Sequence, residues 1–107
     1  MKDKRKPASR TMAESADRHS LYEQSVQGVA EEYDFVSGTF RKLRQRQAHS
    51  AREDFCGTAS MCCEWVRRDE HNTATGVDID PEVLAWGRTH NLAALQPNQR
   101  TRVRLIQ

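Results

Sequence analysis

Apolar residues recur with the period of a helix in the N-terminal part of the chain. Between His19 and Gln47 they are spaced alternately four and three residues apart, which places them on one helical face. They are Tyr22, Val26, Val29, Tyr33, Val36, Phe40 and Leu43. Gly28 and Gly38 interrupt this stripe, so the sequence predicts two helices with a bend rather than one long helix. Residues 18–47 are the predicted N-terminal helical segment, and the polar, basic residues 1–17 are a predicted disordered tail.

From residue 48 to residue 107 the pattern alternates between strands and helices. Strands are expected at 48–55, 73–78 and 102–107, although the first is unusually polar for a buried parallel strand. Helices are expected from Thr58, as the N-cap, to about Asp69 and from an Asp80 N-cap to about Leu95. This order predicts an α/β fold, the N-terminal part of a Rossmann-like doubly wound parallel sheet preceded by one or two helices.

A glycine turn and a later carboxylate mark a candidate ligand site. Gly57 lies between the first strand and the first helix, where it can adopt a positive φ and leaves space for a ligand. Asp78 ends the second strand 21 positions later, near the spacing of roughly 20 residues at which an acidic residue meets a ribose diol. Asp80 is explained by its capping role, whereas Asp78 has no such explanation. The alternative is a βαβ unit that binds no ligand and needs glycine only for its turn.

Two runs of the sequence resemble the class I S-adenosylmethionine-dependent methyltransferases. They are residues 52–59, Arg-Glu-Asp-Phe-Cys-Gly-Thr-Ala, and residues 76–88, Gly-Val-Asp-Ile-Asp-Pro-Glu-Val-Leu-Ala-Trp-Gly-Arg. The resemblance extends from about Tyr22 to the end and is strongest to a poorly characterised branch with Phe-Cys-Gly-Thr-Ala in its first motif. Where that motif has an acidic residue followed by Gly-x-Gly-x-Gly, Glu53 takes the acidic place. The glycine places are taken by Phe55, Gly57 and Ala59, so one glycine of three is kept.

The resemblance implies S-adenosylmethionine as the cofactor. Asp78 would bind the ribose diol, and Ile79 would lie next to the adenine ring. The turn residues near the cofactor would be Phe55, Cys56, Gly57 and Thr58. Tyr22 lies on a helix that often covers the cofactor in this fold and could contact it, although core packing is the favoured role. The catalytic residues are unknown, because the fourth strand that usually carries them would follow Gln107; residues 48–107 then form a partial domain, incomplete at the C-terminus.

Glu53 and Asp54 would point to opposite faces of an extended strand. One of them could accept a hydrogen bond from the amino group of the cofactor's methionine part, and the other could pair with an arginine. A carboxylate pair for general acid–base catalysis is the rival interpretation, and opposite facing disfavours it.

The three cysteines predict no metal site. Cys56, Cys62 and Cys63 form no C-x-x-C pair, and no histidine lies at zinc-finger spacing, so buried reduced thiols are expected. Cys56 lies near a helix N-terminus, where a thiol pKa can fall, but a role in the turn is favoured over a nucleophilic one. The sequence has no apolar run long enough to span a membrane and no secretory signal, so the cytoplasm is the default location.

Three functional hypotheses follow. The first is a methyltransferase, or its N-terminal cofactor-binding part, with an unknown methyl acceptor. The second is another nucleotide-binding Rossmann-like protein, for which the sequence lacks a Gly-x-Gly-x-x-Gly run. The third is a non-enzymatic fragment or interaction module, favoured by the low hydrophobic content of 36% beside 30% charged residues. A net charge of +2 indicates no partner or oligomeric state, although the basic N-terminus could touch nucleic-acid phosphates.

Overall fold

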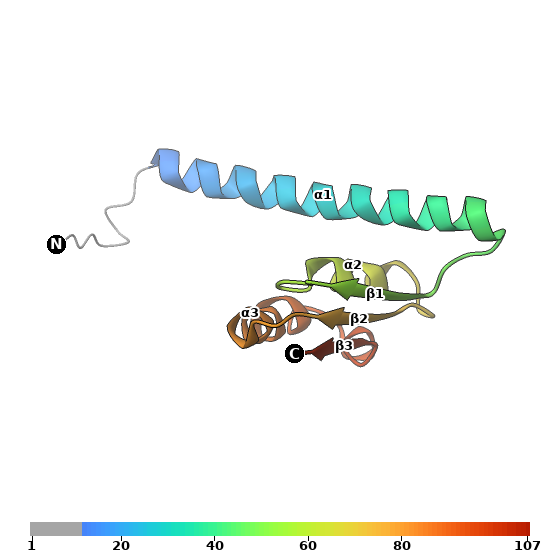
Figure 1. Cartoon of the computed structure of the whole chain (residues 1–107). Helices are drawn as coiled ribbons and strands as arrows, with labels where there is room; N and C mark the ends of the chain where they lie inside the picture. Colours follow the sequence, from blue (N-terminus) through green and yellow to red (C-terminus); the bar gives the residue numbers. More distant parts are fainter. Residues whose placement is uncertain (1–11) are drawn as a thin grey trace.

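The computed structural model describes residues 12–107, with side chains from Val26 onward. One long helix precedes three strands that alternate with shorter helices (Figure 1). The elements are α1 (Met12–Arg44), β1 (Ser50–Asp54), α2 (Ser60–Arg68), β2 (Thr73–Val77), α3 (Pro81–Gly87), η2 (Arg88–Leu92, a π-helix), α4 (Pro97–Arg100) and β3 (Val103–Ile106).

The three strands form one parallel sheet in the order β1-β2-β3. Ser50 pairs with Thr73 at the start of β1, and Ala74 pairs with Val103 at the start of β3. Parallel neighbours need a crossover between them, and each crossover here contains helix, as the sequence pattern predicts. The predicted α/β fold class, with a parallel sheet preceded by a helix, is therefore confirmed.

The N-terminal helix is a single element, so the predicted bend is wrong. Gly28 and Gly38 both lie inside the 33-residue α1. Each glycine costs about 1 kcal/mol of helix propensity relative to alanine, but it keeps its backbone N–H and does not end the hydrogen-bond ladder as proline would. The helix begins at Met12, within the predicted tail, and the rest of that tail lies outside the described residues.

The helix α1 packs on α2, and α2 contacts all three strands (Figure 1). Tyr33 of α1 is buried, with its ring centroid 5.1 Å from that of Trp65 on α2. The guanidinium of Arg68 lies 4.4 Å from the centroid of the same tyrosine ring. The predicted apolar face of α1 is only partly buried: Val26, Val36 and Leu43 are exposed. Tyr33 is thus the main apolar link between α1 and the core.

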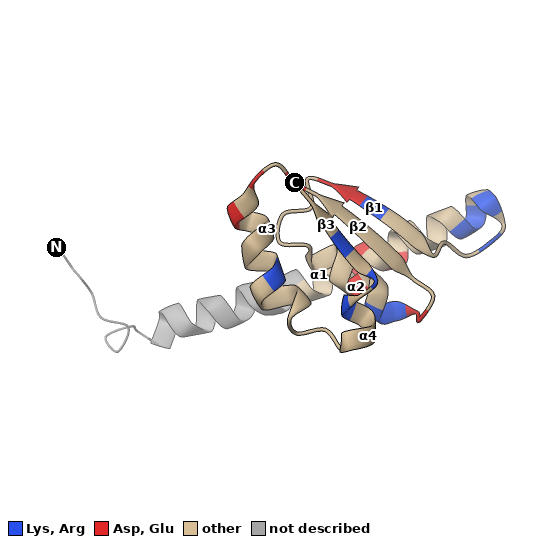
Figure 2. Cartoon of the chain, turned by 90° about the horizontal axis from the view of Figure 1, so that it is seen from below, with Lys and Arg blue, Asp and Glu red and all other residues tan. Residues whose placement is uncertain are grey.

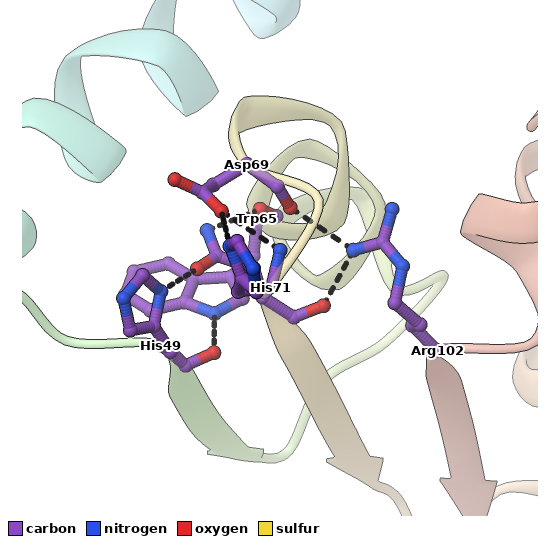
Figure 3. A network of polar contacts seen from close by, with 6 residues as sticks. His49, Trp65, Asp69, His71 and Arg102 are labelled. Carbon is purple, nitrogen blue, oxygen red and sulfur yellow. Dashed lines mark hydrogen bonds and ion pairs between the residues drawn. The ribbon is translucent and has the colours of Figure 1, made fainter.

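A network of polar contacts holds the amino ends of the strands together (Figure 3). The fully buried Asn72 accepts a hydrogen bond from Nδ1 of His49 at 2.9 Å and donates to the carbonyl of Trp65 at 2.8 Å. Trp65 Nε1 donates to the carbonyl of His49 at 2.9 Å, which closes the ring of contacts. Arg102, just before β3, donates to the carbonyls of Asn72 and Asp69 at 2.6 and 3.0 Å. One side chain, that of Asn72, therefore connects the start of β1, the end of α2 and the start of β2.

The substitution Asn72→Ala is expected to lower the free energy of unfolding by about 2 kcal/mol, because it leaves the buried Trp65 carbonyl without a donor. In a domain of this size, that loss corresponds to a fall in Tm of about 8 °C or more. A thermal melt followed by circular dichroism measures the change. The exposed Asn98→Ala is the matched control and should stay within about 0.5 kcal/mol of wild type. Equal melting temperatures for the two variants would contradict the role assigned to Asn72.

Candidate functional site

The turn after β1 is hydrogen-bonded to the end of β2. The backbone N–H of Gly57 donates to Oδ2 of Asp78 at 2.9 Å, across the 21 positions that separate them. The N–H of Cys56 donates to the carbonyl of Val77, also at 2.9 Å. Asp78 in turn donates its backbone N–H to the carbonyl of Ile106 on β3, at 3.0 Å. The two residues that the sequence singled out, Gly57 and Asp78, are therefore in direct contact.

Three alternate residues of this turn have left-handed backbone conformations. Their φ angles are +60° at Phe55, +58° at Gly57 and +67° at Ala59. These are the three positions that correspond to glycine in the resembled motif, and the predicted positive φ of Gly57 is confirmed. The turn thus has the backbone of a glycine-rich loop, although two of its left-handed positions carry side chains that disfavour that conformation.

The carboxylate of Asp78 is held in its ionised form by backbone donors. Its Oδ1 accepts from the N–H of Asp80 at 3.0 Å, and its Oδ2 accepts from Gly57. These hydrogen bonds, that from Asp80 first, lower the pKa of Asp78 below its ordinary value of 3.8. An ionised carboxylate has about four acceptor positions, so two remain for a ligand.

Asp80 has the capping role that the sequence predicts. Its Oδ1 accepts from the N–H groups of Glu82 and Val83 at 2.9 and 3.4 Å, and Pro81 is the first helical residue of α3. The capping role of Asp80 is therefore confirmed, whereas Asp78, for which the sequence offered no structural explanation, has one in its hydrogen bonds to Gly57 and Asp80.

A cavity of about 270 Å³ opens beside Asp78 at the carboxyl ends of β1 and β2. Phe55 and Ile79 line it and are 86% and 82% exposed. The other lining residues are Arg52, Asp54, Val77, Asp78 and Gln107. Exposed apolar side chains beside an ionised acceptor suit a ligand with one flat apolar part and one hydroxylated part. Arg52 and Gln107 were missed by the sequence analysis, since nothing local distinguishes them from other polar surface residues.

Glu53 lies away from this cavity, on the helix-covered face of β1. It lines a separate cavity of about 130 Å³ between α1, β1 and α2, and its Oε1 is 3.7 Å from Sγ of Cys62. Burial raises its pKa above the usual 4.5. Asp54 points the other way and pairs with Arg52 at 2.8 Å, as expected for one of the two carboxylates. Because the side chains of Glu53 and Asp54 lie on opposite faces of β1, a catalytic carboxylate pair is disfavoured here.

Cys56 has the environment of a packed turn residue. It is buried, and burial first, then the charges of Glu53 and Asp78, raise the pKa of its thiol, which disfavours a nucleophilic thiolate. A Cβ on Gly76 would lie 2.8 Å from Sγ of Cys56, so the thiol occupies the space that this glycine leaves on β2. All three cysteines are free and buried, as expected, and burial raises the pKa of Cys62 to about 12.

Thr58 does not cap α2, so that prediction is wrong. The helix begins at Ser60, and the residue before it, Ala59, is left-handed and makes no side-chain capping bond. Thr58 instead contacts the later helices through its carbonyl, which accepts from Nδ2 of Asn91 at 2.8 Å. A Cβ on Gly87 would lie 2.5 Å from the same carbonyl oxygen. Gly87 and Asn91 were missed by the sequence analysis, although their spacing of four residues places both on one helical face.

Tyr22 lies in α1, but its side chain is outside the described part of the chain. In that part, no three histidine, cysteine or acidic side chains are grouped so as to hold a metal ion. Nor does any of the described helices have the length and apolar character needed to cross a membrane.

Known structures with similar folds are methyltransferases. The plantazolicin methyltransferase BamL aligns with a TM-score of 0.59 and 15% identity over 88% of this chain and 32% of its own. The glycopeptide N-methyltransferase MtfA aligns with a TM-score of 0.58 and 21% identity over 75% of this chain and 31% of its own. The methyltransferase domain of bacterial CtHen1 gives 0.56 and 20%, over 78% and 40%.

The chain has the Rossmann-like fold of these methyltransferases. It spans roughly a third of the length of each relative, from 31% to 40%. No protein-family model and no curated protein sequence matches it. At such low identity the likeness shows the fold alone.

The strain of the turn predicts opposite effects for one substitution at two glycines. Gly57→Ala should lower the free energy of unfolding by about 1 kcal/mol, because a left-handed alanine is strained even where space is free. Gly28→Ala, equally unhindered but helical, should raise it by up to about 1 kcal/mol. Urea unfolding of both variants measures the difference. Stabilisation by both substitutions would show that the turn is not held in its left-handed form.

The depressed pKa of Asp78 predicts a window for its contribution to stability. A carboxylate whose folded pKa is lowered stabilises the fold above its unfolded value and loses this effect as pH falls through the folded value. The Tm of wild type should therefore exceed that of Asp78→Asn from pH 7 down to about pH 5, and the difference should close below the ordinary 3.8. Thermal melts across this pH range measure it. Closure already near pH 6 would contradict the assignment.

Proposed function

We propose that this chain is the N-terminal, cofactor-binding part of a class I S-adenosylmethionine-dependent methyltransferase of the branch with a Phe-Cys-Gly-Thr-Ala first motif. The observation that carries the proposal is the hydrogen bond from Gly57 to Asp78, with acceptor positions of Asp78 left over beside the cavity. Structures of MtfA are complexes with S-adenosylmethionine, S-adenosylhomocysteine or sinefungin. The free, buried thiols accord with a reducing compartment, so we propose a cytoplasmic location.

The residues present fit the nucleoside part of this cofactor. Asp78 would accept hydrogen bonds from the two ribose hydroxyls, and Ile79 would cover one face of the adenine ring. The left-handed Gly57 has no atom within 4 Å of the position a Cβ would take, so its backbone is open to close approach by a ligand. Cys56 and Thr58 would act through the turn backbone that they support, and Cys56 does so from a buried position.

When bound, S-adenosylmethionine supplies an electrophilic methyl group on a positively charged sulfur. The contribution of this chain is positioning, because holding the ribose fixes where the reacting group can lie. Asp78 holds the sugar, and its ionised state at neutral pH needs no proton transfer during binding. We propose no proton-transfer role for Glu53, whose side chain lies on the other side of β1.

The proposal predicts that S-adenosylhomocysteine stabilises the folded chain. A ligand that binds only the native state adds about 2.7 kcal/mol at 100 times its dissociation constant, so the melt should shift upward. The buried Trp65 reports on unfolding by its fluorescence. Asp78→Asn should weaken binding by about 10-fold or more, since hydrogen bonds to a charged group are stronger than those to a neutral amide.

Asp34→Asn is the matched control for this experiment. Asp34 is an exposed carboxylate of α1, paired with Arg68 at 3.4 Å, so its loss should leave ligand binding unchanged. A melt that ignores S-adenosylhomocysteine but shifts with a nicotinamide nucleotide would replace the proposal by the second hypothesis. A cooperative melt that responds to neither would favour a chain that binds no such ligand.

A further inference from the structure

Phe55 combines a strained backbone with an exposed side chain. Its φ of +60° lies in the left-handed region, which residues with a Cβ rarely adopt and bulky residues adopt least of all. Burial does not compensate for this, since the side chain is 86% exposed. Strained residues of this kind gather at sites of ligand binding, where the side chain has a use outside the folded core. The exposed phenyl ring of Phe55 is therefore expected to contact a bound ligand.

The position of Phe55 selects which part of a nucleoside ligand it would meet. Asp78 and Ile79 follow β2, whereas Phe55 follows the neighbouring β1, and all three line one cavity. Adjacent strands lie about 4.8 Å apart. The base and the 5′ group of a nucleoside are attached at the two carbons on either side of the ribose ring oxygen. With the hydroxyls on Asp78 and the base beside Ile79, the 5′ group extends away from Ile79, and Phe55 at the end of β1 is the aromatic side chain of the same cavity that it can meet.

The same edge of the sheet is rich in negative charge. Figure 2 colours acidic positions at the end of β1 and at the start of α3, and basic positions in the last turns of α1 and α2 and within β1 and β3. Arg52, Asp54 and Asp78 line the cavity itself. Arg52 forms an ion pair with Asp54 at 2.8 Å, which leaves the carboxylate of Asp78 as the net charge of this lining. A positively charged 5′ group would be attracted to this edge, and a neutral one would not.

We propose that the ring of Phe55 binds the positive sulfonium of S-adenosylmethionine by a cation–π contact, and so distinguishes it from neutral S-adenosylhomocysteine. This rests on the proposed function and adds to it a residue that determines specificity. Such contacts are worth between about 2-fold and 30-fold in affinity, depending on how far water is excluded. Phenylalanine in place of the motif's first glycine then favours the charged reactant over the product that remains after methyl transfer.

The test compares the two ligands on variants at one position. Isothermal titration calorimetry gives the dissociation constants of S-adenosylmethionine and S-adenosylhomocysteine for wild type, Phe55→Leu and Phe55→Trp. Leucine keeps an apolar side chain but removes the aromatic face, so the preference for S-adenosylmethionine should fall by about 2-fold to 30-fold. Tryptophan has the stronger ring and should preserve or increase that preference.

Two further variants serve as controls. Phe35→Leu makes the same change at a 73% exposed phenylalanine on α1 and should alter neither dissociation constant. Phe55→Gly should raise Tm by about 2–6 °C through relief of strain, while it lowers the preference for S-adenosylmethionine as leucine does. This opposition between stability and binding separates a ligand-binding role from a structural one.

Each outcome decides between the proposals. A selective loss for S-adenosylmethionine in Phe55→Leu supports the contact with the sulfonium. An equal loss for both ligands would place the ring against their shared nucleoside and overturn it, as would unchanged affinities. If wild type binds neither ligand, the proposed function fails together with this inference, whereas binding by wild type with no effect at Phe55 refutes the inference alone.

Discussion

The arrangement of this molecule depends on the hydrogen bond between the Gly57 N–H and the Asp78 carboxylate. It joins the turn after β1 to the end of β2, at the edge where parallel strands present their loops. The turn that makes this contact has a left-handed backbone at Phe55, Gly57 and Ala59. The hydrogen bond from the Asp80 N–H, and after it that from the Gly57 N–H, lower the pKa of Asp78, so the carboxylate beside the cavity is ionised at neutral pH.

The two ends of the sheet are stabilised in different ways. At the amino ends, the fully buried Asn72 bonds the side chain of His49, before β1, and the carbonyl of Trp65 on α2 (Figure 3). At the carboxyl ends, the donors and acceptors are partly exposed, and apolar side chains point outward. In α/β folds, ligands bind at the carboxyl ends of the strands, which are the more exposed ends in this sheet.

Much of the fold could be predicted from the sequence, because its signals are local. The Asp80-Pro81 start of α3 follows from capping preferences, and the spacing of Gly57 and Asp78 follows from the βαβ layout. The bend in α1 was predicted from two glycines, but an uninterrupted backbone ladder prevailed over their weak propensity. Thr58 was predicted as a cap from its residue type, whereas Asn91 and Gly87 draw its carbonyl to another helix. The face of β1 on which Glu53 lies could not be predicted from the sequence. Only the tertiary structure shows that α2 covers that face and that the cavity beside Asp78 is elsewhere.

The fit between Cys56 and Gly76 has a consequence for how this sequence can change over time. A Cβ at position 76 would meet the sulfur at 2.8 Å, and also Leu105 at 3.0 Å, so any larger residue on β2 needs a smaller neighbour first. The two positions are therefore epistatic: a larger residue at position 76 is harmful while position 56 is cysteine and is tolerated better once position 56 carries a smaller residue. The order of the two substitutions along a lineage is therefore constrained, with the smaller residue at position 56 coming first.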